Sequence, residues 1–297
     1  MPTGLTAVRI LGWSVIDEAQ PLAPLDFSST LQTLDEACSW LPGGAYTTFR
    51  TYEGNKVIRL EDHFQRLEES ARLASHPQTI NRSCVRQALR DALRQVAGLG
   101  KGGVAQPDDF RFRLVLDLEK RPGDLYLVCE PLPLLPPAAY ERGVKVILTR
   151  QLSRHLPQAK LTDFIPQAEA ERHKLPEDVN ETLMVDAQGF ILEGLSSNFF
   201  AVKQGEIWTA QQGVLDGITR RQALVAAQAV GIPVHRQSLR IDEIDQISEA
   251  FITSASRGVL PVTQIGDFLI GSGLPGTLTR RLMSAYNNRL ALELETI

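Results

Sequence analysis

The chain of 297 residues contains little cysteine and few histidines. Its cysteines, Cys38, Cys84 and Cys129, are odd in number and form no CxxC or Cys/His metal spacing, so we interpret them as reduced, buried thiols of a cytoplasmic protein. The five histidines show no metal-ligand spacing either: His63, His76, His155, His173 and His235. We therefore expect neither a disulfide framework nor a metal site.

Long hydrophobic runs and clusters of one charge are also missing. No run approaches the ~20 apolar residues that span a bilayer, and the stretch from Met1 to Ile16 lacks the basic and apolar regions of a secretory signal. The net charge is −4 and no Lys/Arg run stands out, so nothing recruits nucleic acid or an anionic membrane. With 43% hydrophobic and 22% charged residues, the chain can bury the core of one large or two medium domains.

The apolar patterns before residue 131 predict a sheet. Alternation over 110–118 puts four apolar side chains on one face of a strand: Phe110, Phe112, Leu114 and Leu116. A second strand is expected at 124–130. The composition of 53–55 is typical of a hairpin turn, which would join strands at 45–52 and 56–60.

Helical periodicity predicts one amphipathic helix capped by Asp62, a second ended by Gly98, and a closing helix over 277–295. Beyond residue 137, strands and helices again alternate. The strands are expected at 144–149, 183–186, 189–202, 250–254 and 259–265, and the helices from 163 onward and over 220–230.

Two segments without periodicity separate these elements. Residues 100–107 are expected to form a loop, and residues 131–137 contain four prolines, so we interpret them as an interdomain linker. We therefore predict an α/β (α+β) protein with mixed sheets: a small N-terminal domain over 1–130 and a larger C-terminal domain over 138–297.

One carboxylate, Glu193, occupies an apolar setting. It follows the run 190–192 and precedes a Gly-Leu-Ser-Ser-Asn turn that leads into the apolar strand 199–202. Desolvating an unpaired carboxylate costs several kcal/mol, so a buried Glu193 requires a cation or a proton. The alternative is an edge-strand glutamate that points into water.

The run Glu193-Gly-Leu-Ser-Ser-Asn-Phe-Phe, with Ala-Lys160-Leu-Thr-Asp before it and Gly217-Ile-Thr-Arg after it, resembles the class IV aminotransferases of pyridoxal-phosphate fold type IV. The likeness runs from about Gly44 to Val262 in the same motif order. That family includes branched-chain and D-amino acid aminotransferases and 4-amino-4-deoxychorismate lyases. The resemblance implies pyridoxal 5'-phosphate as cofactor, a site between the two domains, and a homodimer.

The resemblance also implies roles for single residues. Lys160 would be the amine that forms the Schiff base with the cofactor, and Glu193 would pair with the protonated pyridine nitrogen. Arg66, in His-Phe-Gln-Arg-Leu, matches a His-x-x-Arg-Leu motif whose arginine binds the phosphate. Without the resemblance, Lys160 would be interpreted as a solvated loop lysine and Arg66 as a surface helix arginine.

The phosphate is expected at the start of a helix. Gly217, Ile218 and Thr219 open the apolar helix 220–230, and a helix N-terminus presents unpaired N–H groups to an anion. Taken alone, these three residues also suit a plain capping turn. The matched motifs add five further residues to the expected cofactor site: Ser197, Asn198, Ser254, Ala255 and Ser256.

At the second phosphate turn the chain departs from its relatives. Ala255 stands where they often have a threonine hydroxyl, so Ser254, Ser256 or backbone N–H groups would have to replace it.

The substrate is expected to contact Tyr46, which matches a tyrosine in the family's Gly-x-Tyr strand. Arg111 and Arg113 share one face of a strand and could bind a carboxylate in a bidentate way, although an alternating arginine face is often just solvated. The Arg-x-His carboxylate trap of the D-amino acid enzymes has no match in 111–113. Phe164 stands near Lys160 where branched-chain enzymes tend to have a tyrosine.

We therefore predict a pyridoxal-phosphate enzyme that moves an amino group between an amino acid and a 2-oxo acid, branched-chain-like, with Lys160 as general acid and base. The alternative is a 4-amino-4-deoxychorismate lyase, which eliminates pyruvate with the same lysine and cofactor. The stretch 256–259 is compatible with it. A non-catalytic relative is a third possibility, which the presence of both Lys160 and Glu193 opposes.

Overall fold

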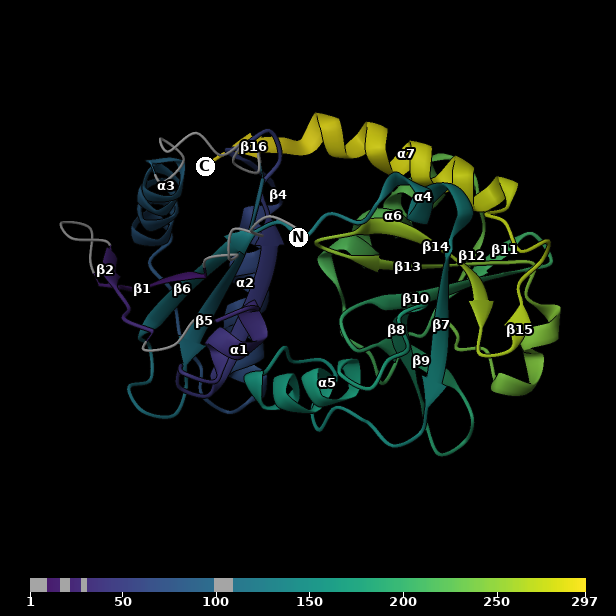
Figure 1. The fold of residues 1–297 in the computed structure, drawn as a ribbon, viewed down its shortest axis with the longest axis horizontal. Helices are drawn as coiled ribbons and strands as arrows, with labels where there is room; N and C mark the ends of the chain where they lie inside the picture. Colours follow the sequence, from purple (N-terminus) through teal and green to yellow (C-terminus); the bar gives the residue numbers. More distant parts are fainter. Residues whose placement is uncertain (1–9, 17–21, 28–30, 99–108) are drawn as a thin grey trace, which may run out of the picture. The chain divides into compact units, whose positions relative to one another are not determined.

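The computed structural model describes residues 10–16, 22–27, 31–98 and 109–297, and the chain divides into two compact units. Unit 1 contains the chain up to Pro133 together with 159–166 and 294–297, and unit 2 contains 134–158 and 167–293 (Figure 1). The chain first passes between the units inside the proline-rich stretch 131–137. The division differs from the predicted ranges because residues 159–166, which include Lys160, and the C-terminal residues belong to unit 1.

Unit 1 contains an antiparallel sheet with the strand order β2-β1-β6-β5-β3. Its strands are β1 (Leu11–Val15), β2 (Leu22–Pro24), β3 (Gly44–Arg50), β5 (Phe110–Asp117) and β6 (Leu125–Pro131). The predicted apolar face is confirmed, because Phe110, Phe112, Leu114 and Leu116 all lie in the core beneath the helices α2 (Leu60–Leu73) and α3 (Arg82–Gly98). The short helix α1 (Leu34–Cys38) packs on Val128 and Val115 of the opposite face.

The predicted hairpin of 45–52 and 56–60 is confirmed only at its turn, where Tyr52 and Lys56 exchange backbone hydrogen bonds over 2.8 and 2.9 Å. β4 (Lys56–Ile58) makes only an isolated bridge from Lys56 to Tyr52, and it pairs along its length with the C-terminal strand β16 (Leu294–Thr296). The closing helix therefore ends earlier than predicted, at Glu293. This pairing places the side chain of Ile297 in the apolar core of unit 1. A local turn pattern cannot predict such a contact between segments far apart in the sequence.

The start of α2 also differs from the prediction. Its N-cap is Arg59, in the left-handed region with φ 53° and without a side-chain capping bond, so Asp62 is not the cap. The Leu60 N–H instead donates to Glu295 Oε1 over 3.0 Å. The C-terminal segment thus supplies the acceptor that the helix start lacks. The loop predicted at 100–107 lies outside the described residues.

Unit 2 is built around a nine-stranded mixed sheet with the path β12-β11-β10-β13-β14-β7-β8-β9, and β15 attached to β14. β9 also pairs with β10, so the strands from β10 to β9 close into a ring. The bounds are β7 (Val144–Thr149), β8 (Val179–Val185), β9 (Ile191–Gly194), β10 (Asn198–Lys203), β11 (Glu206–Trp208), β12 (Val234–His235), β13 (Glu249–Ser254), β14 (Gly258–Ile265) and β15 (Phe268–Leu269). The pairs β7–β8, β7–β14 and β11–β12 are parallel, which confirms a mixed sheet.

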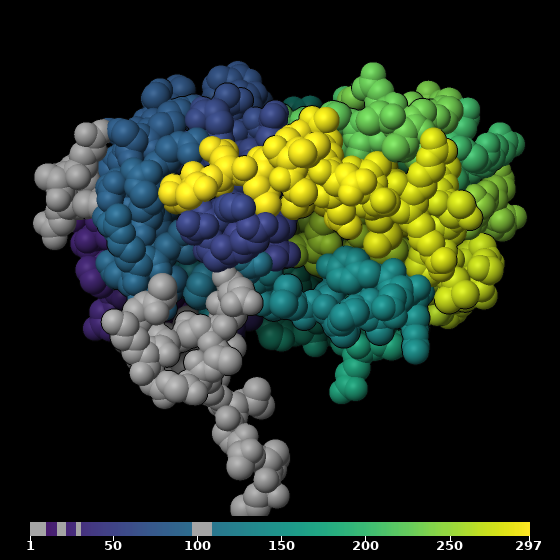
Figure 2. Space-filling model, turned by 90° about the horizontal axis from the view of Figure 1, so that it is seen from above, coloured from purple at the N-terminus to yellow at the C-terminus, as the bar shows by residue number. Residues whose placement is uncertain are grey.

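Two helices cover one face of this sheet. Phe200, Phe251 and Val259 pack under α6 (Ile218–Ala229) and α7 (Thr277–Glu293), which lie side by side in Figure 1 and on the surface shown in Figure 2. The alternate residues of the same strands, such as Phe199 and Ile252, belong to a separate apolar cluster. This alternation is the period of two that strands impose.

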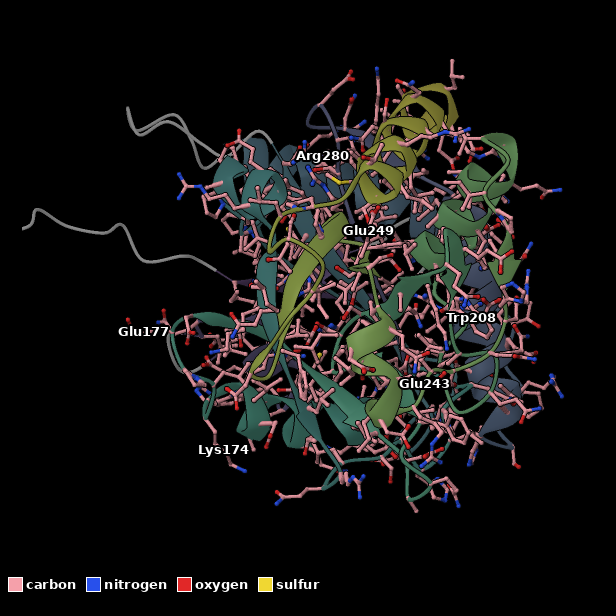
Figure 3. All side chains as sticks on the ribbon, turned by 90° about the vertical axis from the view of Figure 1, so that its right-hand side faces the viewer. Lys174, Glu177, Trp208, Glu243, Glu249 and Arg280 are labelled. Carbon is pink, nitrogen blue, oxygen red and sulfur yellow. The ribbon has the colours of Figure 1, made fainter. Side chains whose placement is uncertain are left out.

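The start of α7 depends on a strand of the sheet. Glu249 of β13, labelled in Figure 3, accepts hydrogen bonds from the backbone N–H groups of Leu278 and Thr279 over 3.1 and 2.6 Å. A Cβ at Gly276 would lie 2.3 Å from Glu249 Oε1, so this close approach requires glycine. Three short helices complete the unit: α4 (Pro137–Arg142), the part of α5 (Ile165–Arg172) from Gln167 onward, and a 3₁₀ turn at Ile241–Gln246.

The helix predicted from Asp163 begins as a 3₁₀ turn over Thr162–Phe164. Among the helices of the described residues, none combines the length and the apolar character that crossing a bilayer demands.

Candidate functional site

Glu193 lies at the end of β9 with 2% of its surface exposed, so the alternative of a glutamate pointing into water is wrong. Its Oε2 accepts hydrogen bonds from Asn198 Nδ2 over 2.9 Å and from the Leu215 N–H over 3.1 Å. Its Oε1 lies 2.9 Å from Nε of Arg154, which is itself buried. The carboxylate therefore has a cation beside it, as the burial argument required. The sequence reasoning missed Arg154, because no local pattern connects it to β9.

Asn198 links Glu193 to the start of α6. Its Nδ2 also donates to the Leu215 carbonyl over 2.7 Å, and a Cβ at Gly217 would lie 2.2 Å from its Oδ1. Gly217 has φ −64°, which any residue adopts, so glycine is required here for close approach alone. The predicted counter-charge and the predicted phosphate helix therefore meet within unit 2.

The start of α6 has the features of an anion site. Its N-cap Gly217 offers no side chain, so the first N–H groups of the helix have no capping acceptor from it. Ile218 and Thr219 in the first turn are buried. Thr253, the register partner of Asn198, is 1% exposed, and its hydroxyl has no hydrogen-bond partner among the described residues. A buried hydroxyl of this kind is costly unless a ligand or water satisfies it.

A second buried carboxylate, Glu181 of β8, supports the turn behind Glu193. Its Oε2 accepts from the hydroxyls of Ser196 and Ser197 over 3.0 and 3.1 Å and from Arg257 over 2.8 Å. Burial acts to raise the pKa of Glu181, but Arg257, the charge of Arg172 and the Ser196 hydrogen bond together outweigh it, so the pKa lies below its ordinary value. The sequence reasoning missed Glu181, although an acid within the apolar strand Val179–Val185 was a usable signal.

Gly194 explains how Glu181 comes so near. A Cβ at that position would lie 2.4 Å from Ser197 Oγ and 2.9 Å from Glu181 Cγ. Within the polar motif after Glu193, the hydroxyls of Ser196 and Ser197 hydrogen-bond to Glu181, and the amide of Asn198 hydrogen-bonds to Glu193.

Lys160 lies in unit 1, half-buried rather than fully solvated. Its N–H donates to Ser70 Oγ over 3.0 Å, and its carbonyl accepts the Tyr46 N–H over 2.9 Å. Its Nζ is 4.5 Å from the centroid of the Tyr46 ring, a cation–π contact. The predicted substrate residue Tyr46 is therefore the neighbour of the predicted catalytic amine.

Arg66 belongs to the same part of unit 1. Its guanidinium donates to Thr47 Oγ1 over 2.7 Å, and that hydroxyl is 2.8 Å from Nδ1 of the buried His63. The Ser70 hydroxyl donates to the Arg66 carbonyl over 2.7 Å while accepting from Lys160. Ser70 therefore links Arg66 to Lys160. The sequence reasoning did not identify Ser70.

Arg111 and Arg113 do not form a solvated face. Arg111 pairs with Glu130, and Arg113 is buried and pairs with Asp35 over 2.7 Å. Arg113 also stacks on the Tyr46 ring, with 4.8 Å between its guanidinium carbon and the ring centroid. Both cations are neutralised inside unit 1, and their role in substrate binding stays a prediction.

The sequence from residue 44 to 265 matches the model of the amino-transferase class IV family. The chain belongs to the class IV aminotransferases. It is therefore an enzyme of a family that works with pyridoxal 5'-phosphate, and its fold is that of fold type IV.

Relatives that are named as aminotransferases agree with this assignment. The chain is 26% identical over 262 residues to a branched-chain-amino-acid aminotransferase of Escherichia coli K12, covering 80% of each chain. It is 28% identical over 255 residues to a probable branched-chain-amino-acid aminotransferase of Thermotoga maritima, covering 83% of this chain and 86% of the relative.

Solved structures show the same fold. A putative branched-chain amino acid aminotransferase from Thermotoga maritima superposes with a TM-score of 0.71 at 27% identity, covering 95% of this chain and 96% of that one. The PLP-bound form of a hypothetical aminotransferase from Mycobacterium tuberculosis gives a TM-score of 0.74 at 18% identity, covering 96% of this chain and 99% of that one.

Proposed function

We propose that this enzyme moves an amino group between a branched-chain amino acid and a 2-oxo acid, using pyridoxal 5'-phosphate held by Lys160, Glu193, Arg66 and the start of α6. One observation carries the proposal. The buried Glu193 carboxylate is held by Asn198, whose other side lies against Gly217. A carboxylate for a ring nitrogen and an anion site for a phosphate are two of the groups that this cofactor needs.

The residues present fit the cofactor. The uncapped start of α6 and the buried Thr253 hydroxyl are polar groups that a phosphate could satisfy. Glu193 supplies the negative charge for a protonated pyridine nitrogen, and Arg66 supplies a cation for the phosphate. Bound pyridoxal 5'-phosphate supplies an electron sink for the charge that develops at the substrate Cα.

Each of these residues has a task in the reaction. Lys160 would hold the cofactor through its amine and would move the proton at the substrate Cα as general acid and base. The Tyr46 ring beside Nζ holds the lysine in position. Asn198, Leu215 and Arg154 keep the Glu193 carboxylate fixed, so it would need no reorganisation to stabilise a positive charge on the cofactor ring.

The substrate class comes from the relatives, whose names specify branched-chain amino acids. The test is a donor screen with the purified, cofactor-loaded enzyme. With 2-oxoglutarate as acceptor, L-leucine, L-isoleucine and L-valine should each yield glutamate, whereas D-alanine should yield none. Activity with D-alanine and none with the three L-donors would contradict the proposal. Release of pyruvate from 4-amino-4-deoxychorismate, without glutamate formation from any donor, would favour the lyase.

We also propose a homodimer, which the family resemblance implies. Light scattering of the purified enzyme after size-exclusion chromatography should give twice the chain mass of 32.8 kDa. A monomer of full activity would contradict it.

A further inference from the structure

Arg257 stands at the turn between β13 and β14, directly after the predicted second phosphate turn at 254–256. Its side chain is embedded in polar partners rather than extended into solvent. Nε donates to Ser254 Oγ over 3.0 Å, NH1 donates to Asn180 Oδ1 over 3.0 Å, and NH2 donates to Glu181 Oε2 over 2.8 Å. NH2 also reaches Ser196 Oγ over 3.1 Å. Four of the five N–H groups of a guanidinium are thus engaged.

The partners of Arg257 belong to separate elements of unit 2. Asn180 and Glu181 lie on β8, Ser196 lies in the turn behind Glu193, and Ser254 lies at the end of β13. Glu181 is 2% exposed, so its charge is balanced inside the protein by Arg257. The pair therefore fixes the second turn to β8 and to the turn behind Glu193 at the same time.

The contacts at Ser254 determine what its hydroxyl can do. Oγ accepts from Arg257 Nε over 3.0 Å and from the Arg257 N–H over 3.3 Å. A serine hydroxyl has two acceptor lone pairs and one proton, so these contacts use its acceptor side and direct the proton elsewhere. A hydroxyl that accepts from a cation is also a better donor to an anion. Ser254 directly precedes Ala255, where the side-chain donor is missing.

From these contacts we propose that Arg257, held by Glu181, is a positioning residue that orients the Ser254 hydroxyl toward the phosphate of the cofactor. The inference rests on the proposed function. It assigns Arg257 to the support of the phosphate turn and not to the binding of a substrate carboxylate, because Glu181 already neutralises its charge. The chain thereby replaces the donor that Ala255 lacks with a serine aligned by an arginine.

The test compares two ligands that differ only in the phosphate. The apoenzyme is titrated with pyridoxal 5'-phosphate and with pyridoxal, and binding is followed by absorbance and by quenching of tryptophan fluorescence. The variants are Arg257→Met, Arg257→Lys, Ser254→Ala and the double variant of Arg257→Met with Ser254→Ala. Arg94→Met is the matched control, because Arg94 is an exposed arginine of α3 that pairs with Asp91. Circular dichroism melts check that each variant folds.

Arg257→Met should raise the Kd for pyridoxal 5'-phosphate about ten- to a hundredfold, the range expected for a lost hydrogen bond to a charged group. The Kd for pyridoxal should change by less than about threefold, because pyridoxal makes no phosphate contact. Ser254→Ala should show the same selectivity, and the double variant should be no weaker than the weaker single variant, because both act through one hydroxyl. Arg257→Lys keeps a positive charge opposite Glu181 but lacks the planar guanidinium with its several N–H donors. Its Kd for pyridoxal 5'-phosphate should therefore lie between those of the wild type and Arg257→Met. Arg94→Met should match the wild type.

Equal losses for both ligands would overturn the proposal, because they would assign Arg257 a general structural role. Additive losses in the double variant would also overturn it. If Arg257→Met does not fold, the proposal is tested with Ser254→Ala and Arg257→Lys, which should weaken binding of pyridoxal 5'-phosphate but not of pyridoxal. A wild-type enzyme that binds neither ligand would overturn the proposed function itself, and a wild type that binds both while every variant behaves like it would overturn only the role of Arg257.

Discussion

Gly217→Ala tests how closely the start of α6 and the Glu193 carboxylate are connected. The new Cβ would lie 2.2 Å from Asn198 Oδ1, far inside an ordinary contact of about 3.5 Å. The backbone at Gly217 suits alanine, with φ −64°, so the conflict is steric alone. Asn198 would have to rotate, and it would then lose its hydrogen bonds to Glu193 Oε2 and the Leu215 carbonyl.

The expected magnitude follows from those two hydrogen bonds. A bond to a charged acceptor contributes about 1.5–3 kcal/mol and a neutral one about 0.5–1.5 kcal/mol, so Gly217→Ala should lower the free energy of unfolding by about 2–4 kcal/mol. Urea unfolding followed by circular dichroism measures this change. In the background of Asn198→Ala the obstructing oxygen is absent, so the same substitution should cost less than about 0.5 kcal/mol.

Gly205→Ala is the control for the backbone. A Cβ there meets nothing within 4 Å, but φ is +78°, so the cost should come from backbone strain alone, about 1–2 kcal/mol, and be the same with or without Asn198. The reasoning would be refuted if Gly217→Ala cost as much in the Asn198→Ala background as in the wild type.

Three further predictions concern charge, capping and phosphate binding. The folded-state pKa of Glu181 lies below its ordinary value of 4.5. Its ionised carboxylate therefore stabilises the fold above pH 4.5, and this stabilisation is lost as the pH falls through the lower folded-state pKa. Urea unfolding of Glu181→Gln should show a weaker loss of stability between pH 7 and pH 4 than the wild type. Glu295→Ala removes the acceptor of the Leu60 N–H and should lower the unfolding free energy by about 1 kcal/mol, and an unchanged urea midpoint would refute this capping role. Thr47→Val removes the hydroxyl that Arg66 contacts and should raise the Kd for pyridoxal 5'-phosphate about tenfold while sparing pyridoxal, whereas equal effects on both ligands would contradict it.

Local patterns predicted the elements whose stability is local. The apolar face of β5 follows from alternation, and the helix at Ile218–Ala229 follows from its apolar period and its glycine start. The turn composition at 53–55 predicted the bridge between Tyr52 and Lys56, but not the strand partner of β4, which lies at the other end of the chain. A local sequence pattern does not predict contacts between segments so far apart in the chain.

In the candidate site, too, the sequence predicted local features but not long-range contacts. Glu193 was identifiable because an acid in an apolar run needs a partner, and the need was met, but by Arg154, which no spacing rule connects to it. Arg111 and Arg113 were correctly placed on one strand face. Their acidic partners, Glu130 and Asp35, come from other elements, so the alternative of a solvated face is wrong, and the predicted substrate role stays a prediction. Side-chain periodicity predicts which face a residue is on, and only the fold determines what it meets there.

The proposal that Lys160 and Glu193 serve one cofactor is tested most directly by the visible absorption spectrum of the enzyme reconstituted with pyridoxal 5'-phosphate. The wild type should show an absorption band of the lysine-bound cofactor that L-leucine bleaches and a 2-oxo acid restores. Lys160→Ala should lack that band, and Glu193→Gln should keep it but respond to L-leucine far more slowly. A wild-type spectrum that Lys160→Ala leaves unchanged would contradict the account.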